Sequence, residues 1–419
     1  MVSVQYSSLQ HLKVYLVCGA AVSRGQIYSA CRVLPIFTLS VVCSYLQKAV
    51  LAAVVSVLRS IYMNQERLTL IVTRIDRPVP GSAHIFFEVQ EQPVPDYQAG
   101  QFLTLLFPDL GPIPIRRSYS LASTPGVDRQ LSIGVKRTVN GQASAYLTQK
   151  LQVGDALQAL PPAGQFVLPE MPRPLLLIAG GSGFVPVFAL LKAALNRPGN
   201  DKIQLLLANR NAESVFFRKE LQQLERSHAD RLKVFHLLSQ ATATCEDELK
   251  ATAHTEVRQG RMSNAWLEFW AAQVLGKQMP EAHAFVCGPP GLMLKASMTL
   301  RFLGFGDDRL HQEDFIIHTP FRPEASQLPQ ATITLQFKDK ALSFPVSPGQ
   351  TLLEGALTAG IELPYSCRSG SCTTCSAQLT GGRVEMYTHN SRVDSDATNG
   401  HIFTCVAYPA TPQVELTIR

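Results

Sequence analysis

Between Leu68 and Leu168, apolar residues come in short runs that alternate with polar residues and are separated by turn residues. The runs are LTLIVTRI, AHIFFEVQ, FLTLLF, SYSLAS and QLSIGVKR, and PVPDYQAGQ and LQALPPAGQ are loops between them. Alternation with a period of two and enrichment in β-branched residues are typical of antiparallel strands. We therefore predict an antiparallel β-barrel, assigned to residues 63–170.

From residue 171 to 317 the pattern changes to strands that alternate with helical periodicity. MPRPLLLIAGGSGFVPVFALLKAAL joins an apolar strand to a helix through a glycine turn, and KIQLLLANR follows as the next strand. LKVFHLLS and HAFVCG are further strand candidates, with helices expected around Ser214–Ser227 and Leu292–Leu303. This alternation predicts an α/β domain with a parallel sheet covered on both faces.

A third pattern begins after residues 318–329, a stretch rich in proline and of mixed polarity that we interpret as a linker. In residues 330–419, ATITLQFKDKALSFPV predicts a hairpin and TLLEGALTAG a short helix that stops at Gly360. A chain of 419 residues is long enough for several domains, each with its own core. We therefore expect a multidomain protein.

The first 62 residues differ from the rest of the chain in their balance of charged residues. The net charge is +6, but residues 1–65 hold no Asp or Glu and five of the 38 basic residues. The remainder then has 33 basic residues (38 minus 5) against 32 acidic ones and is nearly neutral. Because phosphate binding needs a basic patch on a folded domain, we expect no nucleic-acid partner.

Three interpretations of residues 1–62 stay open. The charge-free stretch Val33–Gln47 has 15 residues, fewer than the roughly 20 apolar residues that span a bilayer, which leaves an anchor at the membrane surface as the first interpretation. An acid-free segment with Ser and Arg also fits a targeting peptide. Alternatively, Met63 is the natural start. We expect a cytoplasmic protein, with a membrane partner only if the segment is an anchor.

Four cysteines near the C-terminus carry the first chemical signal. Cys367, Cys372 and Cys375 follow the spacing C-x4-C-x2-C, and Cys405 comes later. Such clustering in a long chain favours metal ligation over disulfides. Zinc sites usually pair two C-x2-C units or end in His, whereas this spacing is the plant-type pattern for a [2Fe–2S] cluster. We predict the cluster rather than zinc.

A second signal lies in RRSYSLAS, residues 116–123. It resembles the flavin motif R-x-Y-S of the ferredoxin–NADP reductase family, through Arg117, Tyr119 and Ser120. The resemblance implies that the arginine binds phosphate, the tyrosine ring packs on the flavin and the serine hydroxyl lies near its N5 edge. Without the resemblance, the segment is an ordinary barrel strand.

VKRTVNGQASAYL, residues 135–147, resembles the G-x-x-S segment of the same family through Gly141 and Ser144. Both lie at the start of an expected helix, whose positive end suits a flavin pyrophosphate. Capping of that helix by Ser144 is the purely structural alternative. We expect FAD rather than FMN.

The glycine turn in LLLIAGGSGFVPV is a variant of the dinucleotide-binding fingerprint, with Pro186 at the position of its third glycine. It resembles the family's G-G-[ST]-G-x-x-P form, although Phe184-Val185 stands where Ile-Thr is commoner. The residues expected to bind the nicotinamide nucleotide here are Gly180, Gly181, Ser182, Gly183 and Pro186.

The next strand ends in Asn209 and Arg210, which match the family's N-R, rather than in the acidic residue of many NAD enzymes. Arg210 could accept a 2′-phosphate, whereas Arg218 and Lys219 fit a solvated helix face. The choice between NADH and NADPH stays open.

AFVCGPPGLM places Cys287, Gly288 and Pro289 at the end of another strand, matching the family's C-G-P turn beside the nicotinamide. The resemblance implies that Ser120 and Cys287 shape the hydride-transfer site, the cysteine by packing. HQEDF, residues 311–315, resembles the family's H-T-E-R-F and is expected to close the domain near the flavin.

The domain order from residue 63 to 419 resembles the reductases of phenylacetyl-CoA epoxidase systems. The resemblance implies a C-terminal ferredoxin domain of β-grasp fold and electron flow from NAD(P)H through flavin and [2Fe–2S] to a separate oxygenase or hydroxylase. A reductase for a Rieske oxygenase or a fatty-acid desaturase is the alternative within the same class. A non-catalytic redox sensor is the alternative of another class.

Overall fold

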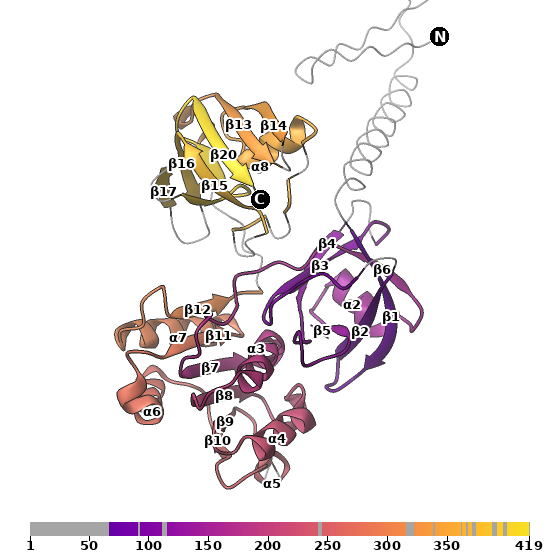
Figure 1. Cartoon of the computed structure of the whole chain (residues 1–419), viewed down its shortest axis with the longest axis vertical. Coiled ribbons are helices and arrows are strands. Elements are labelled where there is room, and N and C mark those ends of the chain that lie inside the picture. Colours follow the sequence, from indigo (N-terminus) through magenta and orange to yellow (C-terminus); the bar gives the residue numbers. More distant parts are fainter. Residues whose placement is uncertain are drawn as a thin grey trace, which may run out of the picture. The chain divides into compact units, whose positions relative to one another are not determined.

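The computed structural model describes residues 67–418, apart from short gaps at 91–92, 111–114, 242–244, 316–321, 338–339, 362, 366–367, 371–373, 388–391 and 397–399. Residues 1–62, and with them the three interpretations of that segment, lie outside the described residues. Within the described part, no helix combines the length and the apolar character needed to cross a bilayer. Figure 1 shows three successive domains, coloured from indigo through magenta to yellow.

The first domain is a six-stranded antiparallel barrel in the order β4-β3-β6-β1-β2-β5. Its strands are β1 (Leu68–Asp76), β2 (Ser82–Gln90), β3 (Phe102–Phe107), β4 (Ile115–Ser120), β5 (Leu131–Lys136) and β6 (Ala156–Ala159), and its helix is α2 (Gln142–Gln149). A bridge between Leu121 and Ile133 joins the end of β4 to β5 and closes the barrel. The predicted period of two appears in β1, where Leu68, Leu70 and Val72 point into the core.

The second domain is a six-stranded parallel sheet in the order β10-β9-β8-β7-β11-β12. Its strands are β7 (Leu175–Gly180), β8 (Ile203–Asn209), β9 (Leu232–Leu238), β10 (Glu256–Gln259), β11 (His283–Cys287) and β12 (Leu310–Glu313). Its helices are α3 (Phe184–Asn196), α4 (Arg218–Ser227), α5 (Cys245–Leu249), α6 (Asn264–Leu275) and α7 (Pro290–Phe302), with 3-10 turns η1 (Gly181–Gly183), η2 (Ala212–Ser214) and η3 (Gly276–Gln278).

Helices cover both faces of this sheet, as predicted. Along β7, Leu175 and Leu177 pack into the core beneath α3, whereas Leu176 and Ile178 pack into the core beneath α6 and α7. The strand order reverses between β7 and β11, because β8 to β10 lie on one side of β7 and β11 and β12 on the other. Ligands of open α/β sheets bind at such a switch point, beyond the carboxyl ends of the strands.

Helix boundaries differ from the sequence expectation in two places. The helix expected around Ser214–Ser227 begins only at Arg218, because Phe217 has a left-handed backbone with φ +52° that ends the preceding turn. The helix expected around Leu292–Leu303 begins at Pro290, a residue that favours the first helical position. Four elements of this domain, α5, α6, β10 and β12, were not predicted from the hydrophobic pattern. In the barrel, β6 covers Ala156–Ala159, so the first residues of LQALPPAGQ form a strand and not the expected loop.

The described residues of the third domain form a mixed five-stranded sheet, a three-stranded sheet and one α-helix. The larger sheet holds β13 (Ala331–Phe337), β14 (Lys340–Val346), β15 (Ser376–Gly381), β18 (His401–Phe403) and β20 (Gln413–Ile418), and the smaller one β16 (Arg383–Tyr387), β17 (Arg392–Asp396) and β19 (Ala407–Pro409). The predicted hairpin is β13–β14, and the predicted helix is α8 (Leu352–Thr358). Gly360 follows α8 with φ +77°. The short turn η4 (Ala325–Gln327) lies in the expected linker.

Candidate active site at the junction of the barrel and the nucleotide domain

Ser120, the last residue of β4 in the barrel, meets Glu313, the last residue of β12 in the nucleotide domain. The buried Ser120 hydroxyl donates a 3.0 Å hydrogen bond to the Glu313 carboxyl oxygen Oε2. Burial raises the pKa of Glu313 to about 8, and the hydrogen bond from Ser120 only partly opposes this. A carboxyl group with such a pKa holds a proton near neutral pH and can deliver it to a neighbour.

Cys287 lies beside Glu313, because the two residues are register partners on the adjacent parallel strands β11 and β12. On its other side Cys287 pairs in register with Ala179 of β7. The thiol is fully buried, and burial, with Glu313 and Asp314, raises its pKa well above the ordinary value. A neutral, enclosed thiol is unreactive, so the geometry favours the packing role expected for Cys287.

The glycines of the dinucleotide turn fit tightly against the C-G-P turn. A β-carbon on Gly183 would lie 2.2 Å from the Cys287 carbonyl oxygen, and one on Gly180 would lie 2.8 Å from Cδ of Pro289. A β-carbon on Gly288 would in turn lie 3.0 Å from the Gly180 amide nitrogen. Only glycines allow these backbones to approach, and α3 then begins at Phe184 with its N-terminus at the switch point.

Two cations approach this turn. The Lys136 ammonium group, at the end of β5, lies 3.6 Å from the position of a β-carbon on Gly181, whose φ is +55°. Burial and the nearby Arg210 guanidinium lower the pKa of Lys136. Two cations beside a helix N-terminus suit phosphate groups. Arg210 was expected here from the sequence, whereas Lys136 was not, although it lies in the quoted VKR segment before Gly141.

Asn209 supplies a further sign of a ligand next to Arg210. Its Oδ1 atom is buried and has no hydrogen-bond partner among the described residues. Buried polar atoms are almost always satisfied, so such an atom fits a donor group of a bound nucleotide. Arg218, by contrast, forms a 2.6 Å ion pair with Glu248, and Lys219 is exposed, as expected for a solvated helix face.

Strand β4, which carries the R-x-Y-S motif, has one solvent-exposed face. Arg117 and Ser118 are exposed, and Tyr119 is half-buried against the barrel core. Burial raises the pKa of the Tyr119 phenol, so it stays neutral at ordinary pH. An exposed guanidinium beside a half-buried ring fits a ligand that carries both phosphate and an aromatic system.

In the G-x-x-S segment, the residue that caps α2 is Gly141 and not Ser144. The buried Ser144 hydroxyl instead donates to the Gly141 carbonyl at 3.1 Å and accepts from the Thr138 amide at 3.1 Å. Ser144 therefore shapes the loop 138–141 from inside. No side chain caps the first turn of α2, which leaves that helix end suited to a pyrophosphate.

Of the four expected cluster ligands, Cys375 and Cys405 are buried in the core of the third domain, and Cys367 and Cys372 lie outside the described residues. The Cys375 carbonyl accepts hydrogen bonds from the Thr404 amide at 3.0 Å and the Thr404 hydroxyl at 3.2 Å. This ties the loop of Cys375 to the residue before Cys405. Arg368 and Gly370 have φ +57° and +76°, so the loop turns sharply, as wrapping a small cluster requires.

Comparisons with known families match all three domains. The family described as "Oxidoreductase FAD-binding domain" matches residues 81–168, and "Oxidoreductase NAD-binding domain" matches residues 177–297. The "2Fe-2S iron-sulfur cluster binding domain" matches residues 335–410. The chain therefore has FAD-binding, NAD-binding and [2Fe–2S] domains, as predicted from the sequence.

Relatives with the same domains are components of oxygenase systems. The ferredoxin reductase component of 3-ketosteroid-9-alpha-monooxygenase from Mycolicibacterium smegmatis is 34% identical over 331 residues, covering 77% of this chain and 87% of the relative. A component of the 1,2-phenylacetyl-CoA epoxidase from Escherichia coli is 28% identical over 360 residues, covering 83% of this chain and 96% of the relative.

Among solved structures, phthalate dioxygenase reductase has the same fold, with a TM-score of 0.50, 23% identity, and coverage of 84% of this chain and 98% of that chain. The predicted three-domain fold class is thereby confirmed. The chain belongs to the family of flavin and iron–sulfur oxidoreductases that includes the ferredoxin reductase components of multicomponent oxygenases.

Proposed function

We propose that this chain takes electrons from NADH or NADPH and passes them through FAD and a [2Fe–2S] cluster to a separate oxygenase or hydroxylase. The observation that carries the proposal is the meeting of Ser120, Cys287 and Glu313 at the switch point. When bound, the nicotinamide supplies a hydride, the flavin accepts it and releases electrons singly, and the cluster carries one electron at a time.

The residues of the junction divide into two binding groups. Arg117, Tyr119, Ser120 and Gly141 would hold FAD, with the exposed face of β4 for its ring and the start of α2 for its pyrophosphate. Ser144 would contribute by fixing the loop 138–141 that leads into α2. The nicotinamide nucleotide would be held by Gly180, Gly181, Ser182, Gly183, Pro186, Lys136, Asn209, Arg210, Cys287, Gly288 and Pro289.

Glu313 and Ser120 would deliver a proton to the reacting centre. Because the pKa of Glu313 is about 8, its carboxyl is mostly protonated at pH 7. The Ser120 hydroxyl already contacts that carboxyl and lies at the end of the flavin strand. The pair is therefore placed to pass a proton from the protein to the reacting centre through Ser120. Cys287 would keep water out beside them.

The four cysteines Cys367, Cys372, Cys375 and Cys405 would ligate the cluster. Thiolate ligands persist in a reducing compartment, which supports a cytoplasmic location. Relatives serve a ketosteroid monooxygenase, a phenylacetyl-CoA epoxidase and a glycine betaine monooxygenase, so an oxygenase is the class of acceptor that we propose.

An anaerobic visible titration of the full chain tests the proposal. We expect flavin bands overlaid on a broad iron–sulfur absorption, and bleaching of both by one nucleotide at low concentration, which also identifies the preferred donor. A protein without flavin, or a cluster that neither nucleotide reduces, would leave only a ferredoxin-like redox module.

A further inference from the structure

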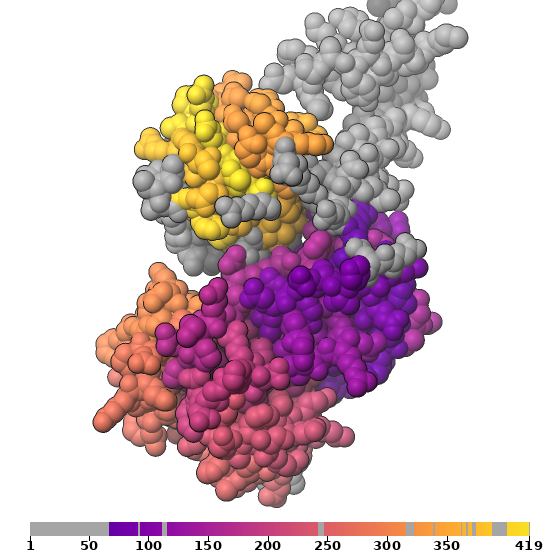
Figure 2. All heavy atoms as spheres, in the orientation of Figure 1, coloured from indigo at the N-terminus to yellow at the C-terminus, as the bar shows by residue number. Residues whose placement is uncertain are grey.

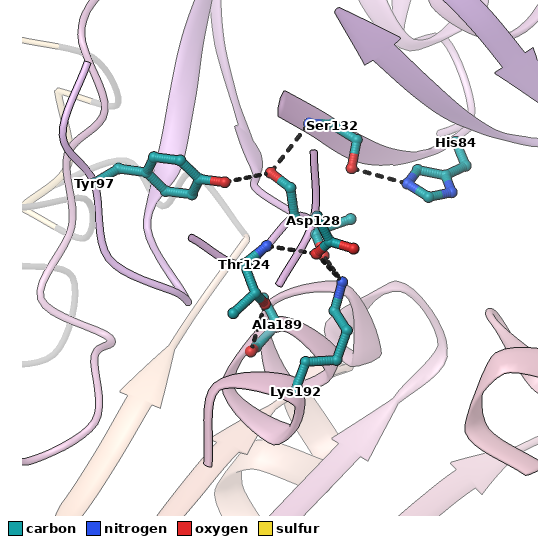
Figure 3. Close-up of polar contacts among 9 residues, drawn as sticks. His84, Tyr97, Thr124, Asp128, Ser132, Ala189 and Lys192 are labelled. Atoms are coloured by element: carbon teal, nitrogen blue, oxygen red, sulfur yellow. Dashed lines mark hydrogen bonds and ion pairs between the residues drawn. The ribbon is translucent and has the colours of Figure 1, made fainter. Parts of the chain in front are cut away.

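The loop 121–128 connects the two halves of the candidate active site. It follows Ser120 directly in the chain, and it contacts α3, the helix that begins just after the dinucleotide turn. Figure 3 shows Lys192 extending from α3 toward this loop. In Figure 2 the atoms of the barrel, in indigo and purple, adjoin those of the nucleotide domain on the face shown.

Three side-chain hydrogen bonds join the loop to α3. The Lys192 ammonium donates to the Ala122 carbonyl at 3.0 Å and also forms an ion pair with Asp128. The Thr124 hydroxyl donates to the Ala189 carbonyl at 2.9 Å. The Asp128 carboxylate additionally accepts from the Thr124 amide at 2.7 Å, so Lys192 and the loop backbone share one carboxylate.

The Lys192 end of the ion pair is shielded from solvent, whereas Asp128 is partly exposed. The side chain of Lys192 is 11% exposed and that of Asp128 is 33% exposed. Burial lowers the pKa of Lys192, and Asp128 opposes this, so the charged amine depends on its partner. Removing Asp128 would leave the shielded Lys192 ammonium without its carboxylate, which makes this contact more consequential than an ion pair exposed at both ends.

The barrel holds the same loop from the other side. The Ser123 hydroxyl accepts hydrogen bonds from the Tyr97 hydroxyl at 2.9 Å and from the Ser132 amide at 3.1 Å. The Ser132 hydroxyl lies 3.0 Å from Nε2 of His84 (Figure 3). These hydrogen bonds fix the loop 121–128 to the barrel. Lys192, a residue of α3, then fixes α3 to the loop.

The path from Lys192 to each half of the candidate active site is short. Ala122 is two residues after Ser120, and Lys192 is nine residues after Gly183 in a continuous helix, about 13 Å along its axis. A shift at Lys192 would therefore displace the dinucleotide turn relative to the flavin strand. Reaction rates depend steeply on such displacements, since about 1 Å of misplacement can cost 100-fold.

We propose that Lys192 is a positioning residue for hydride transfer: by joining loop 121–128 to α3 it sets the position of the nicotinamide site relative to the flavin site. This inference rests on the proposed function. Lys192 acts through Asp128, Ala122 and the loop, not by contact with the reacting groups. It should therefore affect the rate at saturation rather than nucleotide affinity.

The test is anaerobic rapid mixing of Lys192→Met with saturating nucleotide, following flavin reduction. We expect the saturating rate to fall at least about tenfold, while the nucleotide Kd changes less than about threefold and flavin and iron contents match the wild type. Lys192→Arg should restore most of the rate. Lys277→Met, which removes an exposed lysine of the nucleotide domain, is the matched control and should behave as wild type.

An unchanged saturating rate in Lys192→Met, even with a lowered Tm, would overturn the inference and show a purely stabilising role. If Lys192→Met loses flavin, Asp128→Asn and Thr124→Val replace it, because each weakens the same connection by less. Normal saturating rates in both would equally overturn it. Failure of the wild type to reduce its flavin with either nucleotide would instead contradict the proposed function itself.

Discussion

The Ser120 hydroxyl and the Glu313 carboxyl are joined by a 3.0 Å hydrogen bond across 193 residues of chain and between two domains. The same Glu313 is the register partner of Cys287. One carboxyl group thus lies next to both residues that the sequence motifs single out for hydride transfer. Because its pKa is raised to about 8, this carboxyl group can hold and release a proton near neutral pH.

Glu313→Gln should slow turnover at pH 7 by about 100-fold, a typical contribution of a positioned proton donor. The amide can still accept from Ser120 but cannot supply a proton. Because the pKa of Glu313 is about 8, the proton-bearing form is lost as pH rises through 8, and wild-type activity should decline there. The variant should be slow and show no such decline. Steady-state rates from about pH 6 to about 9.5 provide the measurement, and an equally steep decline in the variant would contradict the assignment.

The same pKa predicts an effect on stability. The folded-state pKa of Glu313 lies above its ordinary value of 4.5, so the folded state prefers the protonated carboxyl. Wild-type stability therefore declines as pH rises from below 4.5 toward 8, whereas Glu313→Gln lacks this contribution. The difference in Tm, variant minus wild type, should increase between about pH 5 and about 8. A constant difference would show that the carboxyl is solvated.

Gly183→Ala should disrupt the nucleotide site, because its β-carbon would lie 2.2 Å from the Cys287 carbonyl oxygen. Relieving that clash must separate the two turns, at a cost of about 1–3 kcal/mol in the free energy of unfolding. Gly291→Ala, whose β-carbon meets nothing within 4 Å, is the control and should not destabilise the protein. Denaturant unfolding and nucleotide titration of both variants check this. If the two variants unfold and bind nucleotide alike, the close packing of the dinucleotide turn against the C-G-P turn would be contradicted.

Cys287→Ala should retain FAD and turn over more slowly by about tenfold or less, because the buried thiol packs and does not react. A thiol reagent should label Cys287 in the folded protein only at the rate of unfolding, which peptide mapping after alkylation measures. Complete loss of turnover with an intact spectrum, together with rapid labelling, would indicate a chemical role for the thiol instead.

Lys136→Met should raise the KM for NADH and NADPH alike, by about tenfold, because Lys136 lies at the dinucleotide turn that both nucleotides share. Arg210→Met should raise the KM for NADPH more than that for NADH, because only NADPH carries the 2′-phosphate. Steady-state kinetics with both nucleotides separates the two effects. A loss confined to NADPH in Lys136→Met would reassign that lysine to the 2′-phosphate.

Local patterns predicted many of the helices and strands, and several of the features that they missed depend on long-range contacts. The period of two in β1 and the glycine turn after β7 are readable from neighbouring residues, as is the C-x4-C-x2-C spacing. The segment HQEDF was expected near the flavin, but the role proposed for Glu313 could not be predicted, because it depends on a contact 193 residues away in the chain. Lys192 interrupts the apolar face of α3 and reads as a solvated lysine, but the structure buries it against the barrel.

The central claim is the order of electron flow from nicotinamide through flavin to the cluster. Anaerobic rapid mixing of the full chain with its preferred nucleotide tests it most directly, with the flavin followed by visible absorbance and the cluster by EPR of samples quenched at matched times. We predict that the flavin bleaches first, that the reduced-cluster signal grows afterwards, and that flavin-depleted protein gives no cluster signal. Cluster reduction at the same rate in flavin-depleted protein would contradict this order.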